Sequence, residues 1–183
     1  MRVSTATSSI DARQWESAAE MTAHVRRFKA GVVLGAPGRD DAVGSFVYQE
    51  GPAEDASVDV AIGVAWTPGT YEPQTLVVDG DADDLIVVGF GFEVVGLSRK
   101  TLRVNFRIEL TTYFGSISYL KDIGLLVFEE IGVSLVSLAG VRVWNILTDV
   151  ITEIRLDGNR DLCLAFMDHP PLKVNVMTGA ASE

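Results

Sequence analysis

The chain has few of the residues from which most enzyme and metal sites are built. Its 183 residues include one cysteine, Cys163, and two histidines, His24 and His169. One cysteine allows no intrachain disulfide, and two histidines are too few for the three-histidine metal site of jelly-roll metalloenzymes. Neither a G-x-S-x-G nucleophile motif nor a phosphate-binding loop with its Lys-Ser/Thr ending occurs. The sequence therefore predicts a protein that is not an enzyme.

Basic residues are also scarce. Lys and Arg number 15 against 25 Asp and Glu, which gives a net charge of −10, yet 48% of the residues are hydrophobic. Because binding to a phosphate backbone needs clustered Lys and Arg, we expect no direct nucleic-acid partner. The hydrophobic content indicates a large core or subunit interfaces beneath an acidic surface. Arg outnumbers Lys and Asp outnumbers Glu, which favours a halophilic source, where salt screens self-repulsion.

Long apolar runs are missing as well. The longest late stretch without charge, residues 131–141, is too short to cross a bilayer. The N-terminus, "MRVSTATSSIDARQW", lacks the apolar segment of a signal peptide. We expect a chain that is not secreted by a signal peptide, and that is either soluble or attached to something through its surface.

Hydrophobic spacing indicates one helix followed by many strands. Asp11 is placed to cap a helix, and apolar residues from Trp15 to Phe28 recur at helical spacing. After Gly31 the period becomes two, most clearly in "SVDVAIGVAW", "LIVVGFGFEV" and "TLRVNFRIEL", which predicts half-buried antiparallel strands. In the second of these runs, Gly89 and Gly91 are expected where a backbone or a bulky aromatic ring packs closely.

About ten strands without intervening helices predict an all-β fold, specifically a jelly-roll β-sandwich or barrel with extra strands and one N-terminal helix. The expected organisation is an N-terminal arm and amphipathic helix over residues 1–30, a jelly-roll domain over 31–179, and a tail over 180–183.

An acidic stretch, "DGDADD", precedes the apolar run that starts at Leu85. Asp79, Asp81 and Asp83 alternate as calcium ligands do, but Asp84 stands where an EF-hand has Gly, and its closing Glu is also missing. The favoured interpretation is a solvated turn whose charges prevent edge pairing of the following strand. A looser calcium site at these three aspartates is the alternative, and no other cofactor is expected.

The predicted helix ends in a basic cluster, Arg26, Arg27 and Lys29. These charges complement the negative end of a helix dipole. The alternative is a contact with an anionic membrane surface or an acidic partner subunit.

In size, acidity, Asp and Arg bias and strand-after-strand layout, residues 31–179 resemble the small single-jelly-roll major capsid proteins of icosahedral viruses with an internal membrane, especially those infecting halophilic archaea. The resemblance implies a structural virion protein, assembled in the host cytoplasm into the capsid. Its partners would be itself and a larger related capsid protein. Arg26, Arg27 and Lys29 would then face the internal membrane.

Two other functions remain open. One is a trimeric jelly-roll adhesion, receptor-binding or virion decoration module, with aromatic residues at a subunit axis: Tyr113, Phe114 and Tyr119. The other is a carbohydrate-binding or hydrolytic β-sandwich, with a groove built from Trp66, Tyr71 and Trp144 beside Glu129 and Glu130. Packing in the core or at interfaces is the simpler explanation of these aromatic residues.

Overall fold

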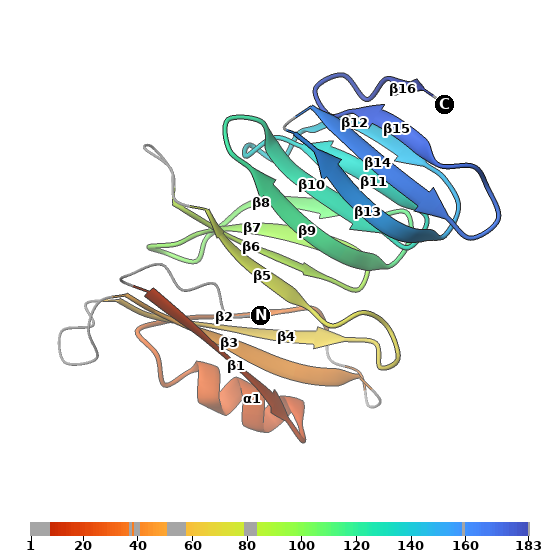
Figure 1. Ribbon diagram of the computed structural model, residues 1–183. Coiled ribbons are helices and arrows are strands. Elements are labelled where there is room, and N and C mark those ends of the chain that lie inside the picture. The colour runs from red at the N-terminus through yellow and green to blue at the C-terminus, as the bar shows by residue number, and fades with distance from the viewer. Residues whose placement is uncertain are drawn as a thin grey trace.

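The chain forms four sheets of four strands each, stacked face to face (Figure 1). The computed structural model describes residues 8–36, 38, 41–50, 58–78, 84–158 and 160–182, which contain sixteen strands and one helix. The predicted all-β class is therefore confirmed. Asp79, Asp81 and Asp83 lie outside the described residues.

The first sheet combines segments from both sides of the helix. Its strand order is β1 (Ser8–Trp15), β3 (Ala42–Glu50), β4 (Val58–Trp66) and β2 (Ala30–Leu34). Strand β2 runs parallel to β4, and the other pairs are antiparallel. Two parallel strands cannot be joined by a tight turn. Here the chain leaves β2, forms β3 on the other side of β4, and then returns as β4 between them.

Helix α1 (Ala18–Val25) lies on the outer face of the first sheet (Figure 1). Met21 and Val25 are buried there against the small side chains of Ala61 and Ala65. The Ser17 hydroxyl caps the helix by accepting a hydrogen bond from the Glu20 N–H at 3.2 Å. The predicted cap at Asp11 is wrong, because β1 continues to Trp15 in register with β3, and this pairing outweighs the local helix signal.

The other three sheets are antiparallel meanders in chain order. The second contains β5 (Gln74–Val78), β6 (Leu85–Phe90), β7 (Glu93–Ser98) and β8 (Val104–Glu109). The third contains β9 (Phe114–Leu120), β10 (Gly124–Glu129), β11 (Gly132–Val136) and β12 (Arg142–Leu147). The fourth contains β13 (Ile151–Asp157), β14 (Asp161–Phe166), β15 (Leu172–Asn175) and β16 (Ala181–Ser182).

This topology does not confirm the predicted jelly roll. A jelly roll has two sheets whose strands are joined by Greek-key connections, whereas a four-stranded meander is the repeating unit of a β-propeller. The described strands form an open stack of four sheets and close into no barrel. Strand alternation predicts which residues face inward but not which strand pairs with which, so it fits either arrangement.

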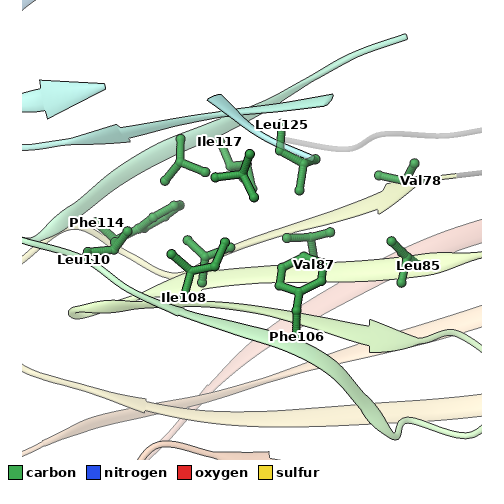
Figure 2. Close-up of a cluster of buried hydrophobic side chains, with 12 residues drawn as sticks. Val78, Leu85, Val87, Phe106, Ile108, Leu110, Phe114, Ile117 and Leu125 are labelled. Carbon is green, nitrogen blue, oxygen red and sulfur yellow. The ribbon is translucent and has the colours of Figure 1, made fainter. Parts of the chain in front are cut away.

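Apolar layers fill the three spaces between the sheets. Figure 2 shows the middle layer, in which Phe106 and Ile108 of the second sheet point toward Ile117 and Leu125 of the third. Strands β6, β10 and β11 are buried along their whole length because a sheet covers each of their faces. Such strands are apolar without interruption, which explains "LIVVGF".

The prediction of one strand from Leu85 is wrong, whereas the prediction of the strand that became β8 holds in part. The run from Leu85 was predicted as one half-buried strand, but it forms a hairpin of β6 and β7 that turns at Gly91 and Phe92. By contrast, β8 is half-buried as predicted at Phe106 and Ile108, which lie inside, and at Arg107, which lies outside. Val104 was also expected inside but is 48% exposed, where the register with β7 shifts.

The two glycines of this hairpin have different roles. A side chain at Gly89 would overlap the ring of Phe114, so the predicted close approach of an aromatic ring is confirmed there. Gly91 instead has a φ of +49° with open space around it, and it serves the turn.

The two ends of the stack are closed differently. Helix α1 covers the first sheet, whereas the outer face of the fourth sheet carries polar side chains from Arg155, Asp157, Asp161 and Lys173. Lys173 Nζ lies 2.9 Å from Asp161 Oδ2 on this face. Strand β16, at the end of the chain, pairs with β15. No helix among the described residues is long and apolar enough to cross a membrane.

Candidate functional site

The predicted calcium ligands lie outside the described residues, and the residues on both sides of them are described. The segment with Asp79, Asp81 and Asp83 connects β5 to β6, and Leu85 begins β6 as expected. Asp84, the next residue, lies 3.7 Å from the buried guanidinium of Arg99. Within the described ranges, no three Asp, Glu, His or Cys side chains gather as a metal site would require.

The basic cluster predicted at the end of the helix is on the surface. Arg26, Arg27 and Lys29 are all exposed, and they follow directly on α1. Arg27 also lines a depression of about 490 Å³ together with Arg13 and His24. Arg13 comes from β1. Sequence reasoning missed Arg13 because it placed this residue on the same helix as the others.

Aromatic and cationic groups stack around this depression. The Arg13 guanidinium lies 4.1 Å from the centre of the Trp15 ring, and Trp15 donates a hydrogen bond to the Ser45 hydroxyl at 2.8 Å. The ring centres of Trp15 and His24 are 4.6 Å apart, and His24 also meets Phe28 edge-on at 5.1 Å. These contacts fix β1 against α1.

Burial, together with the nearby charges of Arg13 and Arg27, lowers the pKa of His24 below its ordinary value of 6.5. Desolvation and neighbouring positive charges both disfavour the imidazolium. The charges of the depression are balanced, because Glu16 and Glu20 line it together with Arg13 and Arg27. The other histidine, His169, lies in the turn after β14, with Nε2 3.6 Å from Asp149 Oδ2.

The aromatic residues of the expected carbohydrate groove do not come together. Trp66 is buried between the first two sheets, and Trp144 packs between the third and fourth, where it donates a hydrogen bond to the Val176 carbonyl at 2.8 Å. Phe114, expected at a subunit axis, is buried in the middle layer. Packing explains these three residues.

Tyr71 is different, because the structure brings it to Tyr113 and Glu130. The three residues line one depression of about 370 Å³ at an end of the strands, together with Gly69 and Thr70. They come from three separate connections, β4–β5, β8–β9 and β10–β11. No spacing in the sequence indicates that these connections meet.

Three exposed apolar residues lie at β12, the edge strand of the third sheet: Val141 just before the strand, and Val143 and Leu147 on it, with the exposed Asn145 between these two. Val141, Val143 and Leu147 are 62%, 53% and 54% exposed. Alternate residues, Trp144 and Ile146, point the other way and pack against the fourth sheet. Among the strands that the structure describes, β12 pairs only with β11.

Comparison with known proteins identifies no family. No family model and no curated protein matches the chain. Among solved structures, BamB from Moraxella catarrhalis is 15% identical with a TM-score of 0.48, over 82% of this chain and 47% of that one. BBS1N in a complex with ARL6DN is 15% identical with a TM-score of 0.49, over 96% of this chain and 55% of that one.

A third solved structure, a protein of unknown function from Bacteroides caccae, is 15% identical with a TM-score of 0.35, over 82% of this chain and 58% of that one. The chain thus spans about half the length of these structures. All three TM-scores are below 0.5.

Proposed function

We propose that this protein is a structural subunit that acts by assembling through its surfaces and not by catalysis. The observation that carries the proposal is the apolar edge at β12, where Val141, Val143 and Leu147 are all more than half exposed. An exposed hydrophobic edge strand aggregates unless something covers it. A protein that keeps such an edge therefore has a partner for it.

A second copy of the chain fits this edge. The free side of an edge strand presents N–H and C=O groups that pair with another strand, and two copies related by a twofold axis pair antiparallel. The exposed apolar residues at the edge would be buried at the same time, as in obligate subunit contacts. The hydrophobic content of 48% in a chain of net charge −10 supports the same conclusion.

In its most specific form, the proposal is a virion capsid subunit that lies over an internal membrane and pairs with a larger related chain. Arg26, Arg27 and Lys29, exposed at the helix-covered end of the stack, would face the membrane. This form assumes a jelly roll, which the stack of meanders does not supply. Its support is the acidic, Arg-rich and Asp-rich composition.

Mass in solution and electron microscopy, each in molar and in low salt, test the proposal. We expect dimers or larger assemblies in molar salt that dissociate at low salt, because screening weakens repulsion between acidic surfaces. Ordered shells or capsomers would support the capsid form. A monomer under every condition would contradict assembly altogether.

A pair of variants locates the interface. Val143→Lys places a charge among the exposed apolar residues at β12 and is expected to abolish assembly. Ile154→Lys makes the same kind of change at a residue that is 42% exposed on β13, an edge strand of the fourth sheet. We expect Ile154→Lys to assemble normally. Equal loss of assembly in both variants would show that β12 is not the interface.

A further inference from the structure

The depression beside Tyr71 combines aromatic faces with negative charge. Tyr71 is 50% exposed, and it shares the depression of about 370 Å³ with Tyr113 and Glu130. The Tyr113 ring rests on Phe92, with ring centres 4.3 Å apart and planes tilted by 37°. Phe92 lies in the β6–β7 turn and is itself 45% exposed. Three rings from three connections thus gather beside one exposed carboxylate.

Backbone hydrogen bonds hold Tyr113 in place. The Tyr113 carbonyl accepts a hydrogen bond from the Glu130 N–H at 2.9 Å, and the next residue, Phe114, donates to the Gly91 carbonyl at 2.7 Å. These bonds join the end of the β8–β9 connection to the β6–β7 turn of the second sheet and to the β10–β11 turn of the third. They position the backbone of Tyr113, and the contact with Phe92 supports its ring before any ligand arrives, which lowers the entropy cost of binding.

A second carboxylate is buried behind this connection. Glu129 is only 3% exposed, and its Oε2 accepts hydrogen bonds from the N–H groups of Thr111 and Thr112 at 2.6 and 2.8 Å. Its other oxygen, Oε1, is buried and has no hydrogen-bond partner among the described residues. A buried carboxylate oxygen without a partner is costly, and a nearby positive charge would offset that cost.

The loop that carries Tyr71 is also shaped locally. Pro68 and Gly69 occupy a turn in which Gly69 has a φ of +81°, and the Thr70 hydroxyl donates to the Thr67 carbonyl at 2.6 Å. The Thr70 hydroxyl proton is thus already used within the turn. The side-chain hydrogen-bonding groups that remain in the depression are the hydroxyls of Tyr71 and Tyr113 and the carboxylate of Glu130.

We propose that this depression binds an organic cation, namely a quaternary or methylated ammonium group. Aromatic faces attract such groups through their quadrupoles, and a carboxylate beside them adds direct charge attraction. All five lining residues lack positive charge, and the whole chain carries −10. An uncharged sugar could stack on the rings and hydrogen-bond to the two tyrosine hydroxyls, but it would make no use of the negative charge of Glu130. This site is separate from the assembly edge at β12 and does not depend on the proposed function.

NMR titration of the full chain with choline tests the proposal. We expect saturable shifts at the Tyr71 and Tyr113 resonances. The neutral isostere of choline, in which carbon replaces the charged nitrogen, is expected to bind about tenfold more weakly, because it lacks the cation–π attraction. Equal binding of choline and its neutral isostere would overturn the proposal, as would binding of oligosaccharides without binding of choline.

Variants of the lining residues connect the signal to the site. Tyr71→Ala should weaken choline binding by about tenfold, whereas Tyr71→Phe keeps the ring and should bind as the wild type does. Glu130→Gln removes the exposed charge and should also weaken binding. The matched control is Glu153→Gln, which removes the same charge from an exposed position on β13. An identical effect of Glu130→Gln and Glu153→Gln would show that only the net charge matters and would overturn the site.

Two ligands with the same head group distinguish its natural source. Phosphatidylcholine vesicles present the group on a lipid surface, and a peptide with trimethyl-lysine presents it on a protein. The source is a lipid if the vesicles shift Tyr71 and the peptide does not, and a modified protein if the reverse holds. Either result supports cation recognition, and failure of both together with choline refutes it. The oligomeric mass of each variant, measured in parallel, keeps this result distinguishable from a failure of assembly.

Discussion

The sheets in the middle of the stack are covered on both faces by other sheets, whereas each sheet at an end has only one neighbouring sheet. The second and third sheets each lie between two other sheets, so β6, β10 and β11 are buried on both faces. The first sheet has helix α1 on its outer face, and the fourth has a polar outer face. In stacked folds, end units with a polar outer face keep the array soluble. Strands of similar length are thus buried on both faces in the middle of the stack and on one face at the polar end. What differs is whether another sheet covers the second face.

The largest effect is expected from a cavity in the middle layer. Leu125 is fully buried between the second and third sheets, and Leu125→Ala should lower the free energy of unfolding by about 3–4 kcal/mol. The matched control is Leu156→Ala on the edge strand β13. Leu156 is 38% exposed, and its loss should lower the free energy of unfolding by less than about 1 kcal/mol. Urea denaturation measures both. Similar losses would contradict the contrast between the middle and the end of the stack.

A smaller loss of unfolding free energy is expected when a methyl group is added to the tightly packed middle layer. Gly89→Ala places a methyl group against the Phe114 ring and should cost about 2–3 kcal/mol in the free energy of unfolding. At Gly91, two residues further, an added side chain meets open space, and Asn tolerates a positive φ. Gly91→Asn should therefore lower the free energy of unfolding by about 1 kcal/mol or less. If thermal melting ranks these two variants the other way, backbone conformation outweighs packing in this hairpin.

At the helix-covered end, the loss should be smaller and local. Ser17→Ala removes the hydroxyl that caps α1 and should cost about 1 kcal/mol. Hydrogen exchange should then be faster in the first turn of α1 than in the middle sheets. Ser118→Ala, at an exposed position on β9, serves as the control and should leave exchange in α1 unchanged. Uniform acceleration throughout the molecule would show that the helix and the middle sheets unfold as one unit.

The smallest effect concerns the pKa of His24. Because burial and the charges of Arg13 and Arg27 lower this pKa, the unfolded chain takes up the proton more readily than the folded one. The contribution of His24 to stability is therefore present above pH 6.5 and is lost as the pH falls through its folded pKa. Arg13→Gln should raise the pKa measured by NMR toward its ordinary value. Arg26→Gln, outside the depression, should not change it.

Much of the local structure follows from the sequence. Alternation in "TLRVNFRIEL" predicted that Phe106 and Ile108 face inward, and Leu85 begins a strand as expected. The helix was predicted to exist, but its start was placed too early, because Asp11 is a residue type that caps helices and Trp15 fits the helical spacing of the residues after it. Gly89 was found from sequence because a glycine within a strand leaves few explanations other than a close neighbour.

The candidate sites, in contrast, could be predicted from the sequence only in part. The expected partners of Tyr71, Trp66 and Trp144, are buried in different layers. Glu130 was expected beside Tyr71 and does line the same depression, whereas Tyr113 was not expected there. Both lie more than forty residues from Tyr71 along the chain, on connections that meet only because the sheets stack. In the same way, Arg13 reaches His24 only because β1 pairs with β3 beneath the helix.

The sequence by itself determined the all-β class, the acidic surface and the inward face of several strands, because these depend on composition and on a period of two residues. The tertiary structure decided that the strands form four stacked sheets, and it decided which loops share an end of the stack. Strand pairing and sheet stacking depend on the fit between distant surfaces, and no local period records that fit.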